Sequence, residues 1–324
     1  MDVLCDYYEA RHWINKRVPS SRPDQPKFEA CCKQGDVVLP PFRQPPDFLR
    51  NLLQDRTPSA RHFRQQLRQY NAALSFTSFN CTVTDRGAPG GVNCFQIHGE
   101  LYHLQGPLDA AASQAPRYAQ LYFYDPAYAT EARLRANTQL DGAILRGLLD
   151  MLYDVNNPYI QLYLTARERL RARQHSAGPS RVILNPQMRL VLEEGADRRR
   201  ENLPTSDEVA VLIPDEYGDP SYRDIVLADR GGPADQPRCH RINATHAAYM
   251  PLHYVLLFPH GDRGWHYQLR LRGARQRDRL TLRQYFRFYL HVRNGHELVP
   301  FAYYRLFQQY LVDAWAICDQ HQLD

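Results

Sequence analysis

Lysine is nearly absent from this chain of 324 residues. Three of its 40 basic residues are lysines (Lys16, Lys27 and Lys33), and the other 37 are arginines. Each lysine follows a residue other than glycine, so the chain holds no Gly-Lys dipeptide. A Walker loop needs Gly-Lys followed by Ser or Thr, because its lysine reaches the β- and γ-phosphates of the nucleotide. The sequence therefore excludes a P-loop ATPase.

Long apolar runs are also absent. The longest are Val209–Pro214 and Tyr254–Pro259, far below the ~20 residues of a transmembrane helix. The first residues, Met1–Asp6, lack the basic and apolar regions of a secretion signal. Seven cysteines, an odd number without such a signal, are typical of a reducing compartment. We expect an intracellular protein with no membrane partner.

The chain also lacks the Gly-x-Ser-x-Gly turn of serine hydrolases. The adjacent tyrosines Tyr303 and Tyr304 remain as candidate nucleophiles. Tyr303, however, begins a series of apolar residues at helical spacing, which predicts a side chain packed in the core. The members of this series are Tyr303, Phe307, Tyr310, Ala314 and Ile317. We therefore assign no catalytic residue.

What the chain does contain predicts a folded protein. A content of 44% hydrophobic, 11% aromatic and 23% charged residues is typical of globular chains. Helical periodicity indicates helices over 46–54, 57–74, parts of 127–175, 281–292 and 300–318. Alternating or apolar segments between turn residues indicate strands at 95–104, 118–124, 182–184, 190–192, 208–213 and 224–227. We predict an α+β fold of mixed helices and short antiparallel strands.

Residues 1–40 differ in composition from the remainder. They are rich in cysteine, proline and aromatic side chains, and they carry no long periodic run. A stiff proline-rich connector, Pro40–Pro46, follows them. We predict a small Cys- and His-containing module over 1–40 and a larger region over 41–324, with a candidate division into two subdomains near 176–205.

The N-terminal module offers candidate metal ligands. A segment this short needs a staple to hold a fold, and Cys5, His12, Cys31 and Cys32 are the side chains suited to one structural zinc ion. Two features oppose the site. Tyr8 stands where a Cys-x2-Cys pair would place its second cysteine, and adjacent cysteines are difficult to direct at one tetrahedral ion. Buried free thiols are the alternative.

The strongest chemical signal is a basic segment near the C-terminal end. Between Arg270 and Arg293 lie eight arginines and the single acid Asp278, a net charge of +7. Clustered arginine with interleaved aromatics is typical of surfaces that contact phosphates and stack on single-stranded bases. The residues expected to do so are Arg270, Arg272, Arg275, Arg277, Arg279, Arg283, Phe286, Arg287 and Tyr289. The alternative is a solvated arginine face on a helix whose aromatics are buried.

Eight stretches, in their order and spacing, together resemble one known family over nearly the whole chain. They are Cys5–Trp13, Cys31–Pro41, Gln69–Thr77, Phe95–Tyr102, Tyr118–Asp125, Asn202–Ala210, His253–Trp265 and Arg305–Trp315. The chain resembles the Helitron transposon Rep–helicase proteins, and specifically the Helitron helicase-like domain that lies upstream of their nuclease centre.

The resemblance implies a function only where the motifs match. Helitron proteins nick DNA with a His-hydrophobic-His metal motif and catalytic tyrosines, and then unwind it with a Pif-type helicase. No two of the thirteen histidines here are separated by one residue, so the metal motif is absent, as is the Walker loop. Tyr303 and Tyr304 lie on the wrong side of the missing motif. For residues 1–40 the resemblance implies a degenerate zinc-finger-like module, in which Tyr8 replaces a family cysteine.

We therefore expect a non-catalytic N-terminal portion of a Helitron-type transposase, a truncated transposon-derived copy that is not an enzyme as it stands. Its expected activity is accessory binding to DNA, single-stranded and sequence-tolerant, in the nucleus. The alternative is a scaffold that packs on a downstream Rep nuclease or helicase without touching DNA. Arginines that share one exposed face favour DNA binding, and arginines paired with acids favour the scaffold.

Overall fold

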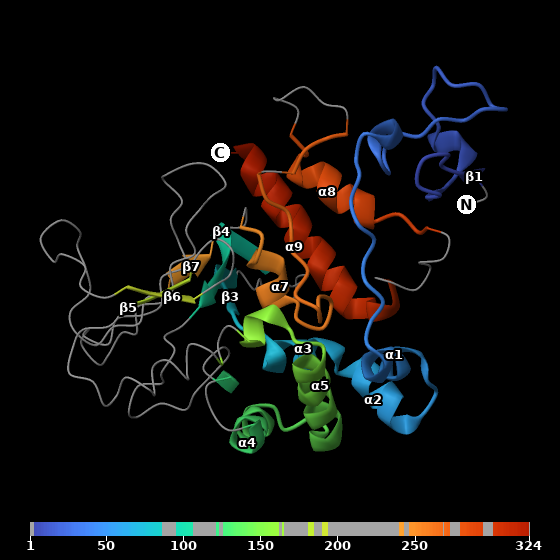
Figure 1. Ribbon diagram of the computed structural model, residues 1–324. Coiled ribbons are helices and arrows are strands. Elements are labelled where there is room, and N and C mark those ends of the chain that lie inside the picture. The colour runs from blue at the N-terminus through green and yellow to red at the C-terminus, as the bar shows by residue number, and fades with distance from the viewer. Residues whose placement is uncertain are drawn as a thin grey trace, which may run out of the picture. The chain divides into compact units, whose positions relative to one another are not determined.

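The structure is a computed structural model. It describes residues 3–85, 95–105, 121–122, 126–161, 164, 181–184, 190–193, 240–242, 246–267, 269–272, 279–293 and 301–323. Its contacts divide the chain into two compact units. Unit 1 combines Met1–Leu67 with Arg263–Asp324, and unit 2 is Arg68–Asp262. Helices and short antiparallel strands occur in both, so the fold is α+β as predicted (Figure 1).

Unit 1 begins with a small hairpin and two single-turn 3-10 helices. The strands are β1 (Val3–Leu4) and β2 (Arg11–His12), and the 3-10 helices are η1 (Ile14–Lys16) and η2 (Lys33–Gly35). In the antiparallel register Val3 lies opposite His12.

The N-terminal segment is bonded to the C-terminal part of the same unit. The N–H of Arg11 donates to the carbonyl oxygen of Val292 at 2.9 Å. The hydroxyl of Tyr289 donates to the carbonyl oxygen of Pro40, also at 2.9 Å. Residues 1–40, which the sequence predicted as a separate module, therefore belong to the same compact unit as residues 263–324.

Two short helices follow the proline connector. They are α1 (Asp47–Gln54) and α2 (Pro58–Gln65), and the Thr57 hydroxyl caps α2 by accepting from the N–H of Ala60. The predicted single helix over 57–74 is two helices, because Gln66 leaves helical geometry at φ −103° and ψ 14°. The third helix, α3 (Leu67–Leu74), begins directly after it.

The C-terminal part of unit 1 is built on two helices that lie side by side (Figure 1), α8 (Leu282–Tyr289) and α9 (Tyr304–Leu323), with the 3-10 turn η4 (Phe301–Tyr303) before α9. A capping box starts α8: Thr281 accepts from the N–H of Gln284, and the Gln284 side chain accepts from the N–H of Thr281. The predicted stripe from Tyr303 to Ile317 is buried throughout, which confirms its packing role.

A buried amide joins two of the helices of unit 2. The helices are α3, α4 (Pro126–Ala136), α5 (Gly142–Asp154) and α7 (Tyr249–His253). The Asn71 side chain donates to the carbonyl oxygen of His253 at 2.9 Å and accepts from the N–H of Leu256 at 3.1 Å. Asp141 caps α5 by accepting from two backbone N–H groups. The Asn71 side chain thus joins segments that lie more than 180 residues apart in sequence.

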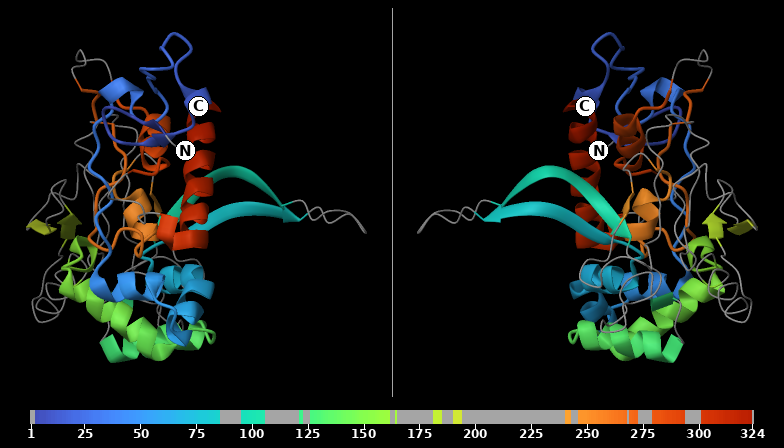
Figure 2. Two further views of the ribbon diagram at one scale, coloured as in Figure 1. Left: turned by 90° about the vertical axis from the view of Figure 1, so that its right-hand side faces the viewer. Right: turned by 90° about the vertical axis from the view of Figure 1, so that its left-hand side faces the viewer.

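The strands of unit 2 form two antiparallel sheets. The first has the order β3 (Ser78–Asp85), β4 (Phe95–Gln105) and β7 (His240–Ile242), and Figure 2 shows β3 and β4 as a long, curved pair. The register shifts between Asn80 and Thr82, an irregularity of the kind that a β-bulge produces. The second sheet pairs β5 (Arg181–Leu184) with β6 (Leu190–Glu193).

The strand predictions fare unevenly. Those at 95–104, 182–184 and 190–192 are confirmed. The one at 118–124 is wrong at its described residues, Leu121 and Tyr122, which form a helical turn with buried side chains. The strands predicted at 208–213 and 224–227, and most of the subdomain division near 176–205, lie outside the described residues. Within the described ranges, none of the helices has the length and apolarity that a membrane crossing requires.

Candidate metal centre and nucleic-acid interface

Cys5 lies in the turn that joins β1 to β2. Its N–H donates to the carbonyl oxygen of Ala10 at 2.9 Å, and its own carbonyl oxygen accepts from the N–H of Glu9 at 2.8 Å. Glu9 closes this turn in the left-handed region, at φ 52°. Because Cys5 and His12 lie on the same face of the hairpin, as diagonal neighbours, the hairpin directs both side chains to one side.

Cys31 and Cys32 precede a second tight loop. Lys33, Gln34 and Gly35 all have positive φ, at 48°, 53° and 94°. The N–H groups of Gly35 and Val37 both donate to the carbonyl oxygen of Cys32. Gly35 is needed here for two reasons. Its φ favours glycine, and a Cβ at this position would lie 2.6 Å from the ring atom Cδ1 of Tyr7.

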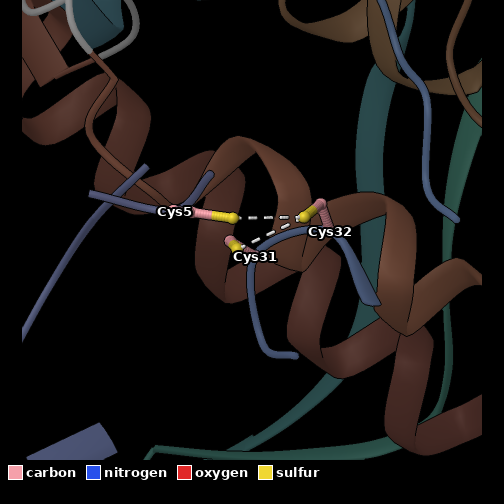
Figure 3. A group of neighbouring side chains, drawn as sticks. All are labelled: Cys5, Cys31 and Cys32. Atoms are coloured by element: carbon pink, nitrogen blue, oxygen red, sulfur yellow. Dashed lines mark hydrogen bonds between the residues drawn. The ribbon is translucent and has the colours of Figure 1, made fainter. Parts of the chain in front are cut away.

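These two loops bring three sulfur atoms together, as Figure 3 shows. The Sγ atoms of Cys5 and Cys32 are 3.6 Å apart, those of Cys31 and Cys32 are 3.5 Å apart, and all three lie within 4.8 Å of one another. A disulfide would place two sulfurs at ~2.05 Å, whereas two ligands of a tetrahedral zinc with ~2.3 Å Zn–S bonds lie about 3.8 Å apart. The separations fit shared metal ligands.

This geometry removes one objection drawn from the sequence. Adjacent cysteines were expected to be difficult to direct at one ion, yet Cys32 adopts φ −151° and ψ 13°, and its sulfur turns toward that of Cys31. Tyr8 still occupies the position of the missing cysteine, and its ring packs edge-on against Phe288 at 5.7 Å. The three sulfurs, all buried, form a group that could hold a metal ion.

The surroundings favour a thiolate at Cys5. Hydrogen bonds from the thiols of Cys31 and Cys32, and from the backbone N–H groups of Tyr7 and Tyr8, lower the pKa of Cys5 despite its burial. The pKa of Cys31 is raised, because its proton is held in hydrogen bonds with the neighbouring sulfurs and its thiol is buried. A metal ion would replace these shared protons, since thiolates are the ligating form.

His12, the fourth predicted ligand, lies beside the cysteine group and not within it. Its ring stacks on Phe28 with centroids 4.1 Å apart, and its Nε2 is buried without a hydrogen-bond partner among the described residues. Burial, and then the charge of His291, lower the pKa of His12 to about 4. The ring is therefore neutral at physiological pH, which is the form that binds metals.

A second imidazole was missed by sequence reasoning. The ring of His291 lies 4.9 Å from that of His12, centroid to centroid. Its Nδ1 is 2.8 Å from the carbonyl oxygen of Arg287, which can only accept, so Nδ1 carries the proton and Nε2 keeps its lone pair. Metal-binding histidines usually donate their second N–H in this way. No sequence pattern links His291 to Cys5, because the two are brought together only by the fold.

The arginines expected to contact nucleic acid are exposed wherever the structure describes them. Arg283 and Arg287 project from the solvent side of α8, one helical turn apart. Arg270 and Arg279 lie opposite each other in an antiparallel bridge. The five described members are Arg270, Arg272, Arg279, Arg283 and Arg287, and none of them has an acidic partner within the described part of the chain. Arg275 and Arg277 lie outside the described residues.

The predicted stacking aromatics require a correction. Phe286 and Tyr289 are 2% and 8% exposed, so their rings face the core of unit 1 and cannot stack on bases. They alternate with the arginines because α8 is amphipathic and buries one face.

The exposed aromatic of this surface is instead Trp315, on the adjacent helix α9. It is 39% exposed, and the guanidinium carbon of Arg283 lies 5.4 Å from its ring centroid. Helical periodicity could have identified this ring as exposed. Trp315 directly follows Ala314, a member of the buried stripe of α9, and therefore lies off that stripe.

Comparison with known proteins adds no family to these observations. No family model matches the chain, and no curated protein matches it.

Proposed function

We propose that the chain is a non-catalytic, Helitron-type accessory module that binds single-stranded DNA through the exposed surface of α8 and α9. The observation that carries the proposal is the set of five exposed arginines without acidic partners in the described ranges. Nuclear location and descent from a transposon are part of the same proposal, and they are supported by the sequence resemblance alone.

Two contacts on this surface suit a phosphate backbone. Like charges directly opposite each other across strands are destabilising, so the pairing of Arg270 with Arg279 favours an anion held between the two side chains. On α8, Arg283 and Arg287 form a second pair of cations. Trp315 then offers a ring face beside Arg283, and base stacking on aromatic rings tolerates any sequence.

We infer that the buried cysteine group holds structural zinc. Cys5, Cys31 and Cys32 supply three thiolates, and His12 or His291 supplies the fourth ligand. Three thiolates with a fourth protein ligand give the four-coordinate set that is typical of a structural zinc ion. Bound there, zinc would join the N-terminal loops to the segment that carries the α8 arginines.

The DNA-binding proposal predicts a specific change in salt dependence. Each phosphate contact with a single strand contributes ~0.7 to the slope of log affinity against log salt. The triple variant Arg279→Gln, Arg283→Gln, Arg287→Gln should therefore flatten the slope by about 2 and weaken binding to every sequence equally. The measurement is fluorescence anisotropy of labelled oligonucleotides over a series of salt concentrations.

The matched control removes three exposed arginines of unit 1 that lie outside α8 and α9, through Arg22→Gln, Arg56→Gln and Arg61→Gln. It has the same net charge, and its slope should stay close to that of the parent. Trp315→Ala should cost about 1–3 kcal/mol of binding with little change in slope, because stacking releases no counterions. Equal slopes for both triple variants would contradict a role for this surface.

A second prediction concerns catalysis. Because the chain has no Gly-Lys dipeptide to contact nucleotide phosphates, the purified protein should neither hydrolyse ATP nor separate a DNA duplex. Phosphate release and strand-displacement assays test this, with each preparation passed through a further column step to remove contaminating helicases. ATPase or helicase activity whose specific activity stays constant through the further column step would refute the prediction.

One observation favours the alternative scaffold function. Tyr304, Val312 and Trp315 are 56%, 66% and 39% exposed and lie along one side of α9, an arrangement that suits an apolar contact with a downstream nuclease or helicase domain. If the parent chain fails to bind DNA even at low salt, this alternative takes precedence.

A further inference from the structure

A cleft of about 480 Å³ opens in unit 1 beside the cysteine group. The loops before and after Cys31 and Cys32 form one wall, and α8 forms the other. Cys31 and Cys32 line it, so its shape depends on the loop that carries two of the three sulfurs of the candidate metal centre.

The charged side chains of this cleft are mostly cations. Lys16, Arg17, Lys33 and Arg287 line it, with Glu29 as the acid. Two of the three lysines in the entire chain therefore meet at one site. The charge of Glu29 is partly satisfied, because its carboxylate accepts from the Gln34 side chain at 2.9 Å. An excess of cations around a cleft favours a multiply charged anion.

The backbone at Lys33 adds a second observation. Its φ of 48° is unfavourable for a residue with a side chain, and strained positions of this kind cluster at binding sites, where the surrounding structure holds them in place. Gly35, two residues further along the same loop, is fixed by the close approach of Tyr7. The loop thus holds a lysine at the rim of the cleft in a conformation that the chain would not adopt freely.

We propose that this cleft is a phosphate-binding site. Because Arg287 belongs both to the cleft and to the exposed arginine face of α8, a single strand lying on that face can place a phosphodiester group in the cleft. That part of the inference rests on the proposed DNA binding. The chemistry recognised is the phosphate group, and its source is either the strand or free inorganic phosphate.

The test removes the two lysines together, with the third as a matched control. Lys16→Gln with Lys33→Gln should flatten the salt slope for a single-stranded oligonucleotide by about 1.4, at ~0.7 per contact. At 0.1 M salt this corresponds to roughly a 25-fold loss of affinity. Lys27→Gln changes an exposed lysine outside the cleft and should leave binding unchanged. Lys16→Arg with Lys33→Arg keeps both charges and should retain binding.

A second arm uses inorganic phosphate alone, titrated by calorimetry at constant ionic strength. Saturable binding that the double Gln variant loses supports the cleft even if the parent fails to bind DNA, and it then identifies free phosphate as the source. If the double Gln variant flattens the salt slope of oligonucleotide binding, the phosphate in the cleft comes from the DNA strand. The proposal is overturned if the double Gln variant matches Lys27→Gln in both arms while circular dichroism shows that all variants are folded.

Discussion

Cys31→Ser is expected to abolish zinc binding and to unfold residues 3–40. Structural zinc sites have apparent binding free energies of about 10–16 kcal/mol, which is as large as the ~5–15 kcal/mol net stability of a whole domain. The loops around Cys5 and Cys32 contain several left-handed residues and little regular structure. Without the ion, these loops keep hydrogen bonds such as that of Arg11 with Val292 but lose the link between the three sulfurs.

The measurement is elemental analysis of the purified protein, with one zinc per chain expected for the parent. Amide hydrogen exchange then shows whether protection is lost within residues 3–40. Cys318→Ser is the matched control, because Cys318 is also a buried free thiol but belongs to α9, away from the cysteine group. It should keep its zinc. A parent protein without metal, purified under reducing conditions, would show that the thiols are only packed.

The fourth ligand is identified by comparing His12→Ala with His291→Ala. Substitution of the histidine that binds the ion should lower zinc affinity steeply. Substitution of the other histidine should lower zinc affinity only ~10–100-fold, as is typical of a residue that hydrogen-bonds to a ligand. Competition with a chromophoric chelator measures both. If the two variants bind zinc as tightly as the parent, neither imidazole is a ligand.

Phe286→Ala is expected to destabilise unit 1 by about 3–5 kcal/mol, because it removes a buried ring and leaves a cavity. The ring lies edge-on to Tyr310 at 5.8 Å and to Tyr285 at 5.4 Å, so α8 and α9 both lose contacts. Urea denaturation followed by circular dichroism measures the change. At low temperature, where the variant is still folded, its affinity for DNA should be close to that of the parent.

Arg283→Ala, on the same helix, is expected to do the opposite of Phe286→Ala: to leave stability almost unchanged and to weaken DNA binding. An exposed side chain of this kind is expected to alter stability by only ~0.5 kcal/mol, yet the substitution should weaken DNA binding and release Trp315 from its cation–π contact. The two variants therefore separate the buried and exposed faces of α8. A Phe286→Ala protein of unchanged stability with lost DNA binding would mean that the ring is accessible after all.

Local features of the sequence predict much of this fold. Thr57 and Thr281 mark the starts of α2 and α8, since a capping side chain needs only residues within one helical turn. The stripe from Tyr303 to Ile317 predicts the buried face of α9 by its spacing alone. The break at Gln66 escapes such reasoning, because the apolar pattern continues through it and its neighbours are good helix formers.

The candidate sites could be predicted only in part. Composition identifies the cysteines and the basic segment, but convergence of sulfurs depends on loops with positive φ at non-glycine residues, which sequence rules disfavour. The contact of His291 with His12 and that of Trp315 with Arg283 depend on tertiary packing. Alternation of aromatics with arginines suggested base stacking, whereas helical periodicity gives the correct burial.

The pairing of the two ends of unit 1 has a consequence for synthesis. Ala10 bridges to Arg293, so the N-terminal loops leave the ribosome long before their partners exist. At ~5–20 residues per second the delay is roughly 15–55 s. Throughout that interval the thiols of Cys5, Cys31 and Cys32 lack the α8 segment that buries them. If His291 completes the proposed zinc site, the full set of ligands exists only after translation, whereas a site completed by His12 could load while the chain is still being made.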